Sequence, residues 1–201
     1  MGGGAACRAP SVVRAGGADP RAAGSLPGVP QREIEYRRLT PEDVGAAALL
    51  IADGFEAYRA FAPAGWEPPG AEDEKRTLQR WAEDPDFWGA VALDSPGVVG
   101  CAAFVPAARH RSRPVADAEL SHLSYLFVAR SHWGSGVATA LLRRAIEDAT
   151  ERGFTAMRLF TPAGQARARR FYEREGFLSA GEPMDIGLGL PSLEYHRVLR
   201  A

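Results

Sequence analysis

The sequence predicts a mixed α+β domain, and three observations support this prediction. The chain has 201 residues, 46% of them hydrophobic, which suffices for one domain with its own core and leaves a surplus at one end. Strand and helix patterns follow one another in the order strand, two helices, three strands, helix, strand, helix and strands. This order lacks the regular alternation of a doubly wound parallel sheet, and no segment repeats along the chain.

The first 31 residues differ in composition from the rest of the chain. They are rich in Gly, Ala, Pro and Arg and contain few large apolar side chains. We therefore expect residues 1–31 to form a disordered tail and residues 32–201 to form the domain. The tail lacks the apolar stretch of a secretory signal, which favours a cytoplasmic protein, and a wrongly assigned start codon is an alternative explanation for it.

Charge and cysteine content exclude several classes of function. The net charge is −1 and the isoelectric point is about 6.4, so no overall basic field would attract nucleic acid or an anionic membrane surface. No apolar stretch of the sequence is long enough to span a bilayer. Cys7 and Cys101 lie far apart, and no cysteine–histidine cluster predicts a metal site.

The N-terminal half of the domain predicts a strand, two helices and a hairpin. Residues 33–39 alternate as in a strand, and Thr40, Pro41 and Asp43 then supply a capping residue, a first-turn proline and a carboxylate for a helix start. Apolar residues at helical spacing extend this helix to Tyr58. A loop rich in Pro and Gly precedes a second helix at 71–83, and apolar strands at 88–93 and 98–105 flank a turn at 94–97.

The C-terminal half of the domain predicts a second series of strands and helices. It comprises a strand at 119–128, an amphipathic helix at 137–151 closed by Gly153, a strand at 155–160, a helix at 165–175, and strands at 177–186 and 193–199.

The turn before the helix at 137–151 carries Gly134 and Gly136. A glycine-rich turn that enters a helix presents unpaired backbone N–H groups and the positive end of the helix dipole, which together bind phosphate. A P-loop is excluded because no lysine follows the turn. A dinucleotide fingerprint is excluded because Thr139 occupies its third glycine position and the turn lies mid-chain. An ordinary tight turn remains the alternative.

Two sequence blocks together resemble the GCN5-related N-acetyltransferase (GNAT) superfamily. The family's pyrophosphate loop reads [QR]xxGx[GA], and the corresponding residues here are Trp133, Gly136 and Ala138. The segment 161–177 is similar to the family's NxxAxxFYxxxGF helix, with Gln165 in place of the usual Asn. The residues of this block that match are Ala168, Phe171, Tyr172, Gly176 and Phe177.

The resemblance implies a central, mostly antiparallel twisted sheet with helices on both faces and two splayed parallel strands, here 121–128 and 155–160. Acetyl-CoA would lie between these strands as co-substrate. Its pantetheine arm would pair with the edge of the first strand, and backbone N–H groups near Leu126 and Phe127 would polarise the thioester carbonyl. The implied cofactor-binding residues are Leu126, Phe127, Val128, Trp133, Gly134, Ser135, Gly136, Val137, Ala138, Gln165, Arg167, Ala168 and Tyr172.

The resemblance also implies an N-acetyltransferase in which a primary amine attacks acetyl-CoA directly in a ternary complex. Tyr172 matches the family's general acid, which protonates the departing thiolate. His122 falls at the position of the family's base, and a buried structural histidine is the alternative. A non-catalytic acyl-CoA-binding or regulatory module on the same scaffold is the rival function. Family members are often homodimers, so a homodimer is one expectation.

The acceptor, a small-molecule or peptide amine, is the part of the function that the sequence describes least. In the family, the helices before the sheet form the wall of the acceptor site. Here they carry aromatic residues that could belong either to that wall or to the core: Phe55, Tyr58, Phe61, Trp66, Trp81, Phe87 and Trp88. Glu67, in the loop after Trp66, is a candidate partner for a cationic amine.

Overall fold

The computed structural model of the protein describes Met1, residues 33–110 and residues 113–199. The described strands and helices all lie within the predicted domain. The prediction that residues 1–31 form a disordered tail lies outside the described residues, apart from Met1.

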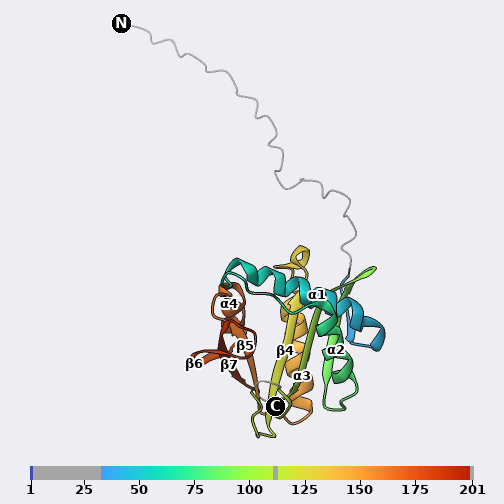
Figure 1. Ribbon diagram of the computed structural model, residues 1–201. Coiled ribbons are helices and arrows are strands. Elements are labelled where there is room, and N and C mark those ends of the chain that lie inside the picture. Colours follow the sequence, from blue (N-terminus) through green and yellow to red (C-terminus); the bar gives the residue numbers. More distant parts are fainter. Residues whose placement is uncertain (2–32, 111–112, 200–201) are drawn as a thin grey trace. The chain divides into compact units, whose positions relative to one another are not determined.

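In the described part of the chain, seven strands form one sheet in the order β1-β2-β3-β4-β5-β7-β6 (Figure 1). Every neighbouring pair is antiparallel except β4 and β5, which run parallel. This arrangement confirms the predicted α+β class and the mostly antiparallel sheet. The strands are β1 (Glu35–Arg38), β2 (Trp88–Asp94), β3 (Gly97–Pro106), β4 (Leu120–Val128), β5 (Ala156–Pro162), β6 (Leu178–Asp185) and β7 (Pro191–Val198).

Within the described residues, four α-helices cover the two faces of the sheet (Figure 1). They are α1 (Val44–Glu56), α2 (Ala71–Ala82), α3 (Val137–Glu151) and α4 (Ala166–Arg174). Short 3₁₀ turns precede and follow α1, at Pro41–Asp43 and Ala57–Ala60. One core lies between the sheet and α1 with α2, and includes Ile51, Leu78 and Val91. The second core, on the other face, includes Leu141 from α3 and Tyr172 from α4.

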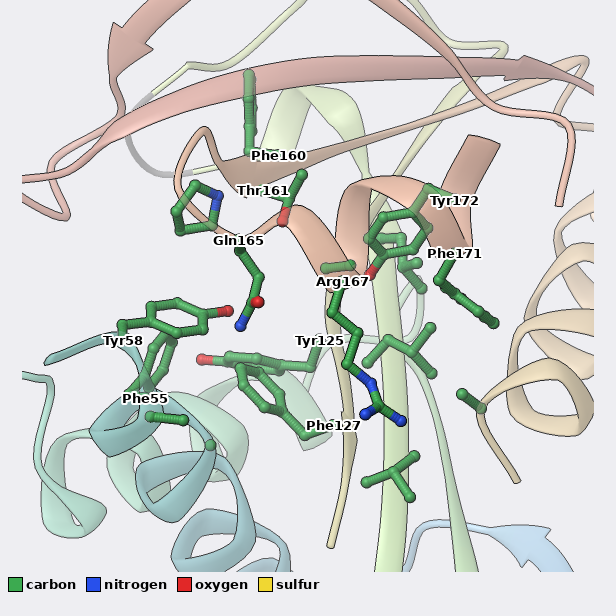
Figure 2. Close-up of a pocket in the computed structure, with 18 of the residues that line it drawn as sticks. Phe55, Tyr58, Tyr125, Phe127, Phe160, Thr161, Gln165, Arg167, Phe171 and Tyr172 are labelled. Atoms are coloured by element: carbon green, nitrogen blue, oxygen red, sulfur yellow. The ribbon is translucent and has the colours of Figure 1, made fainter. Parts of the chain in front are cut away.

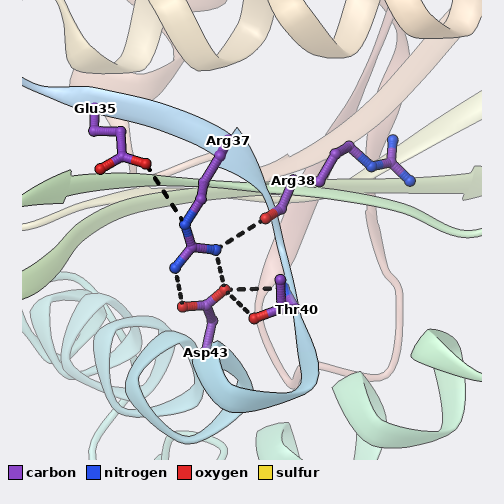
Figure 3. A network of polar contacts seen from close by, with 5 residues as sticks. All are labelled: Glu35, Arg37, Arg38, Thr40 and Asp43. Carbon is purple, nitrogen blue, oxygen red and sulfur yellow. Dashed lines mark hydrogen bonds and ion pairs between the residues drawn. The ribbon is translucent and has the colours of Figure 1, made fainter.

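The 3₁₀ turn that leads into α1 starts where the sequence predicts a helix start, and a polar network fixes it (Figure 3). The Asp43 carboxylate accepts hydrogen bonds from the backbone N–H and the hydroxyl of Thr40, each at 2.9 Å. The Arg37 guanidinium binds both oxygens of the same carboxylate, at 2.6 and 2.9 Å. These contacts lower the pKa of Asp43 to about 2, with the Arg37 hydrogen bonds as the largest cause. Strand β1 is thereby tied to the beginning of α1.

The parallel strands β4 and β5 separate after a short paired stretch. They pair from Leu120 with Ala156 to Leu123 with Leu159 and no further. Beyond this point β5 continues along β7, and β4 continues along β3. The β3–β4 register shifts between Ala103 and Phe104, which leaves Ser124 as an extra residue in β4. The remainder of β4 therefore has an edge that faces no strand, as the predicted splay requires.

Candidate functional site

A cavity of about 750 Å³ lies where β4 and β5 diverge (Figure 2). Its walls come from the C-terminal part of β4, the end of β5, the turn before α3 and the helix α4. The end of α1, the first turns of α2 and the loop between β6 and β7 complete it. Segments from almost the whole length of the domain therefore meet at the open edge of β4.

The hydrogen-bond directions of β4 show which backbone groups face this open edge. The Ala129 N–H donates to the Val99 carbonyl of β3 at 2.8 Å. Because the backbone groups of successive strand residues alternate in direction, those of Phe127 also face β3, and those of Leu126 and Val128 face the cavity. The backbone groups of Leu126 and Val128 therefore lie on the open edge, whereas the N–H of Phe127, which the resemblance placed beside the thioester carbonyl, points toward β3.

The turn before α3 has the backbone geometry that a phosphate-binding loop needs. Gly134 and Gly136 have φ values of +83° and +89°, which strongly favour glycine. A Cβ atom at Gly136 would meet no other atom within 4 Å, so the backbone there is open. The first turn of the 15-residue helix α3 follows at Val137, with N–H groups that lack intrahelical partners. The turn can therefore bind an anion.

Most of the residues predicted to bind the cofactor line this one cavity: Leu126, Phe127, Val128, Trp133, Gly134, Gly136, Ala138, Gln165, Arg167, Ala168 and Tyr172. Two others do not contribute side chains to it. The Ser135 hydroxyl donates to the His132 carbonyl at 2.7 Å, and Val137 is buried in the core beneath α3. Their backbone N–H groups remain part of the turn.

Trp133 connects the turn to both walls of the cavity. Its indole N–H donates to the Val128 carbonyl at 2.9 Å, on the open edge of β4. The Arg167 guanidinium lies 4.2 Å from the centre of the same ring, and the Arg130 guanidinium lies 5.4 Å from it. Stacking on an aromatic face restrains a flexible arginine. Arg167 is thus held where β4, α4 and the glycine turn meet.

Tyr172 has a buried ring and a hydroxyl that points into the cavity (Figure 2). The ring contacts Phe171 and Phe177, with centroid separations of 5.3 and 5.7 Å, and only 8% of the residue is exposed. Burial, and to a smaller degree the nearby Tyr58 phenol, raises the pKa of Tyr172 above its ordinary value. The phenol therefore carries its proton at neutral pH and can donate it.

His122 lies outside the cavity lining. Its ring is buried against His110 and Phe160, with centroid separations of 4.1 and 5.5 Å. Burial first, and then the neighbouring His110 and Arg158, lower its pKa well below the ordinary value, so the ring is neutral at neutral pH. Phe160 lines the cavity and His122 does not. A role for His122 as the base stays a prediction from the sequence that this geometry does not favour.

The aromatic residues of the early helices divide between wall and core. Phe55 and Tyr58 line the cavity, and burial raises the pKa of Tyr58 to about 12. Phe87 and Trp88 are buried in the two cores on either side of the sheet. The half-buried Trp66 instead joins two loops, because its indole N–H donates to the Leu188 carbonyl at 2.8 Å.

The acidic residue in the cavity wall is Glu74 rather than Glu67. Glu67 is 78% exposed and pairs with Arg59 at 2.8 Å. Glu74, the fourth residue of α2, is only 7% exposed and lines the cavity. Its carboxylate accepts a hydrogen bond from the Tyr125 hydroxyl of β4. Helical spacing places Glu74 on the same face of α2 as the buried Leu78, which is the sequence signal that could have found it.

The remaining sequence predictions concern metals, membranes and Cys101. Within residues 33–110 and 113–199, no group of three or more His, Cys, Asp or Glu side chains is placed to hold a metal ion. Of the helices in the described ranges, none combines the length and apolar character needed to cross a bilayer. Cys101 is buried in β3, and burial raises the pKa of its thiol to about 12.

Comparisons with known proteins agree with this architecture. A model of the acetyltransferase (GNAT) family matches residues 51–177, while no curated protein sequence matches the chain. A ribosomal-protein-alanine N-acetyltransferase from Brucella melitensis is 25% identical, with a TM-score of 0.64 over 82% of this chain and 99% of its own. An N-acetyltransferase from Staphylococcus aureus Mu50 is 19% identical, with a TM-score of 0.66 over 84% and 99%. The PaiA N-acetyltransferase from Thermoplasma acidophilum, solved in complex with coenzyme A, is 17% identical, with a TM-score of 0.63 over 83% and 99%.

Proposed function

Because the chain belongs to the GNAT family of acetyltransferases, we propose that it moves the acetyl group of acetyl-CoA onto a primary amine. The amine attacks directly within a ternary complex. One observation carries the proposal. The unpaired edge of β4, the glycine turn before α3 and the protonated Tyr172 face the same cavity. This combination supplies a binding edge, an anion site and a proton donor.

The residues of the cavity fit coenzyme A. Its pantetheine amides would extend the sheet by pairing with the open edge at Leu126 and Val128, as an extended peptide does in strand addition. Its diphosphate would accept hydrogen bonds from the N–H groups of the turn and of the first residues of α3. Arg167, held against Trp133, would add positive charge beside that diphosphate. The bound molecule supplies an activated acetyl group as a thioester.

Leu126 and Tyr172 act on opposite ends of the reacting thioester. As the amine nitrogen forms its bond to the carbonyl carbon, the Leu126 N–H on the open edge stabilises the charge that develops on the carbonyl oxygen. The carbon–sulfur bond then breaks with its electron pair on sulfur, and the Tyr172 hydroxyl gives its proton to that sulfur. Of the two protons that leave the ammonium nitrogen, one restores Tyr172 and the other passes to solvent.

The first test is thermal unfolding of the full chain with acetyl-CoA, CoA or NAD. A ligand present at 100 times its Kd stabilises a protein by about 2.7 kcal/mol, which shifts Tm by several degrees. We expect acetyl-CoA and CoA to raise Tm and NAD to leave it unchanged. Unchanged melting with acetyl-CoA and CoA would contradict the proposed cofactor site.

The second test scores CoA thiol release with a panel of amines. The panel includes 2-phenylethylamine, L-phenylalanine, spermidine and a peptide with an N-terminal alanine. We expect at least one amine to release thiol above the rate of hydrolysis alone, and mass spectrometry to find the acetyl group on its nitrogen. Binding of acetyl-CoA without thiol release by any amine would instead support the rival function, a non-catalytic acyl-CoA-binding module.

A further inference from the structure

We propose that Glu74 and Tyr125 form the subsite that receives the ammonium group of the acceptor, and that this acceptor is a monoamine with an apolar body. The inference rests on the proposed function, since it concerns the second substrate of the same reaction. It goes beyond that function by naming the acceptor class and the side chains that select it.

A carboxylate, that of Glu74, lies in the cavity wall. Acidic side chains are rarely buried without a reason, yet Glu74 is only 7% exposed and lines the cavity. The Tyr125 hydroxyl donates to one oxygen of the carboxylate and fixes its orientation. A carboxylate has about four acceptor sites, so one carboxylate can accept bonds from protein groups and from an ammonium group together. In this poorly hydrated position it would bind a cation more strongly than at the surface.

The Glu74–Tyr125 pair lies beside the open edge of β4. Tyr125 immediately precedes Leu126, whose backbone groups face the open edge. The Tyr125 ring packs in the core on the α1 and α2 face, whereas Leu126 packs on the opposite face. The Glu74–Tyr125 pair therefore lies on the α2 side of the edge where we place the thioester. An ammonium bound there starts beside the carbonyl that its nitrogen must attack.

Acidic and basic side chains come from different elements of the cavity wall. Among the described residues, Glu74 is the only acidic residue that lines it. The three arginines that line it all come from α4: Arg167, Arg170 and Arg174. One carboxylate suits one ammonium group. Among the described residues, a polyamine would find no second acidic partner in this wall, and the three arginines would repel its further positive charges.

Apolar side chains also line the cavity that contains Glu74. The cavity wall also includes Phe55, Tyr58 and Phe160, together with Ile186 and Leu188 from the loop between β6 and β7. Phe55 makes an edge contact with Tyr58 at a centroid separation of 5.5 Å. Aromatic walls of this kind favour an apolar or aromatic body over a strongly hydrated one. The acceptor class is therefore a primary amine on a compact apolar group.

The test compares wild type with Glu74→Gln, Tyr125→Phe and Glu67→Gln, using 2-phenylethylamine as acceptor. Glu67→Gln removes a carboxylate that is exposed and paired with Arg59, so it is the matched control. We expect Glu74→Gln to raise the KM for 2-phenylethylamine by at least about tenfold, because a hydrogen-bonded charge pair is lost. The KM for acetyl-CoA should not change. Tyr125→Phe should give a smaller rise, and Glu67→Gln should match wild type.

A binding measurement separates this inference from the proposed function. Calorimetric titration of 2-phenylethylamine into the CoA-loaded protein should show binding to wild type and a loss of about tenfold or more in Glu74→Gln. A tenfold loss of binding in Glu74→Gln supports the subsite even if no amine is acetylated. An absence of acetylation would overturn the proposed function but not the subsite. Melting with acetyl-CoA checks that each variant folds, and Tyr125→Phe carries the test if Glu74→Gln does not fold.

Three results would overturn the subsite. The first is equal affinity for 2-phenylethylamine in wild type and Glu74→Gln, and the second is an absence of binding to wild type. The third is preferred acetylation of spermidine or L-phenylalanine over 2-phenylethylamine. Each of these two molecules carries a second charged group, and the proposed subsite contains no partner for such a group.

Discussion

Replacement of Tyr172 by Phe removes one oxygen atom from the cavity and leaves the packing of the ring intact. The ring is held by Phe171 and Phe177, and these contacts do not depend on the hydroxyl. The variant should therefore fold and bind acetyl-CoA as wild type does. The substitution should lower kcat rather than the affinity for acetyl-CoA, because the hydroxyl acts only when the carbon–sulfur bond breaks.

The expected loss in Tyr172→Phe is about 100-fold in kcat. General acids contribute about 10²- to 10⁴-fold, and the quality of the leaving group decides where in this range a given acid falls. A thiol ionises near pKa 8.5, whereas a phenol ionises near pKa 10, so the thiolate departs fairly well without help. The lower end of the range therefore applies, equal to about 2.7 kcal/mol of transition-state stabilisation.

The assay is steady-state thiol release at saturating amine, with acetyl-CoA varied. Tyr195→Phe is the control, because Tyr195 is a buried tyrosine of the same core that does not line the cavity, and we expect its kcat to stay within a few-fold of wild type. The raised pKa of Tyr172 also means that kcat should not fall at mildly alkaline pH. A kcat for Tyr172→Phe within threefold of wild type would refute its assignment as general acid.

Two further predictions concern the turn and the start of α1. Gly136→Glu should abolish acetyl-CoA binding, because it places a negative charge where the diphosphate would lie and a side chain at a φ of +89°. Gly136→Ala carries the strain without the charge and should bind more tightly than Gly136→Glu; equal titration curves for the two would argue against an anion site. Asp43→Asn should lower the free energy of unfolding by about 1–2 kcal/mol at neutral pH. The pKa shift of Asp43 from 3.8 to about 2 corresponds to about 2.5 kcal/mol of stability. The partial exposure of Arg37 to solvent screens its interaction with Asp43 and so reduces this contribution. Because the folded-state pKa is lowered, this stability exists above about pH 4 and disappears as the pH falls toward 2. Urea unfolding of both proteins across that range measures it, and a difference that persisted at pH 2 would contradict the linkage.

Local sequence signals accounted for most of the fold. Helix α3 spans the predicted 137–151 because glycines mark both of its ends, at Gly136 and Gly153. The helix predicted to run from Thr40 to Tyr58 is instead a 3₁₀ turn, α1 and a second 3₁₀ turn. Apolar spacing does not distinguish these helix types over three or four residues.

The extra residue Ser124 in β4 is the feature that the sequence could not reveal. Leu123 and Leu126 are three residues apart, yet they belong to the same core cluster, whereas strict alternation would place them on opposite faces. The bulge reverses the alternation at this point, so counting along the strand does not carry across Ser124. His122, before the bulge, is buried beside His110, whereas the lining of the cavity by β4 begins at Leu123.

The two halves of the cavity differ in how much the sequence reveals of them. The cofactor half is built from backbone groups, and its glycines must occupy fixed positions in one continuous turn, so a short motif describes it. The acceptor half is built from side chains of α1, α2, β4 and the loop between β6 and β7, which only the folded chain brings together. Glu74 illustrates the difference, because a glutamate in the first turns of a helix ordinarily indicates an exposed partner for the helix dipole. Its burial depends on Tyr125, 51 residues away. In our proposal, contacts between elements that are distant in the sequence therefore determine the choice of acceptor. Glu74 is the residue whose substitution should change that choice.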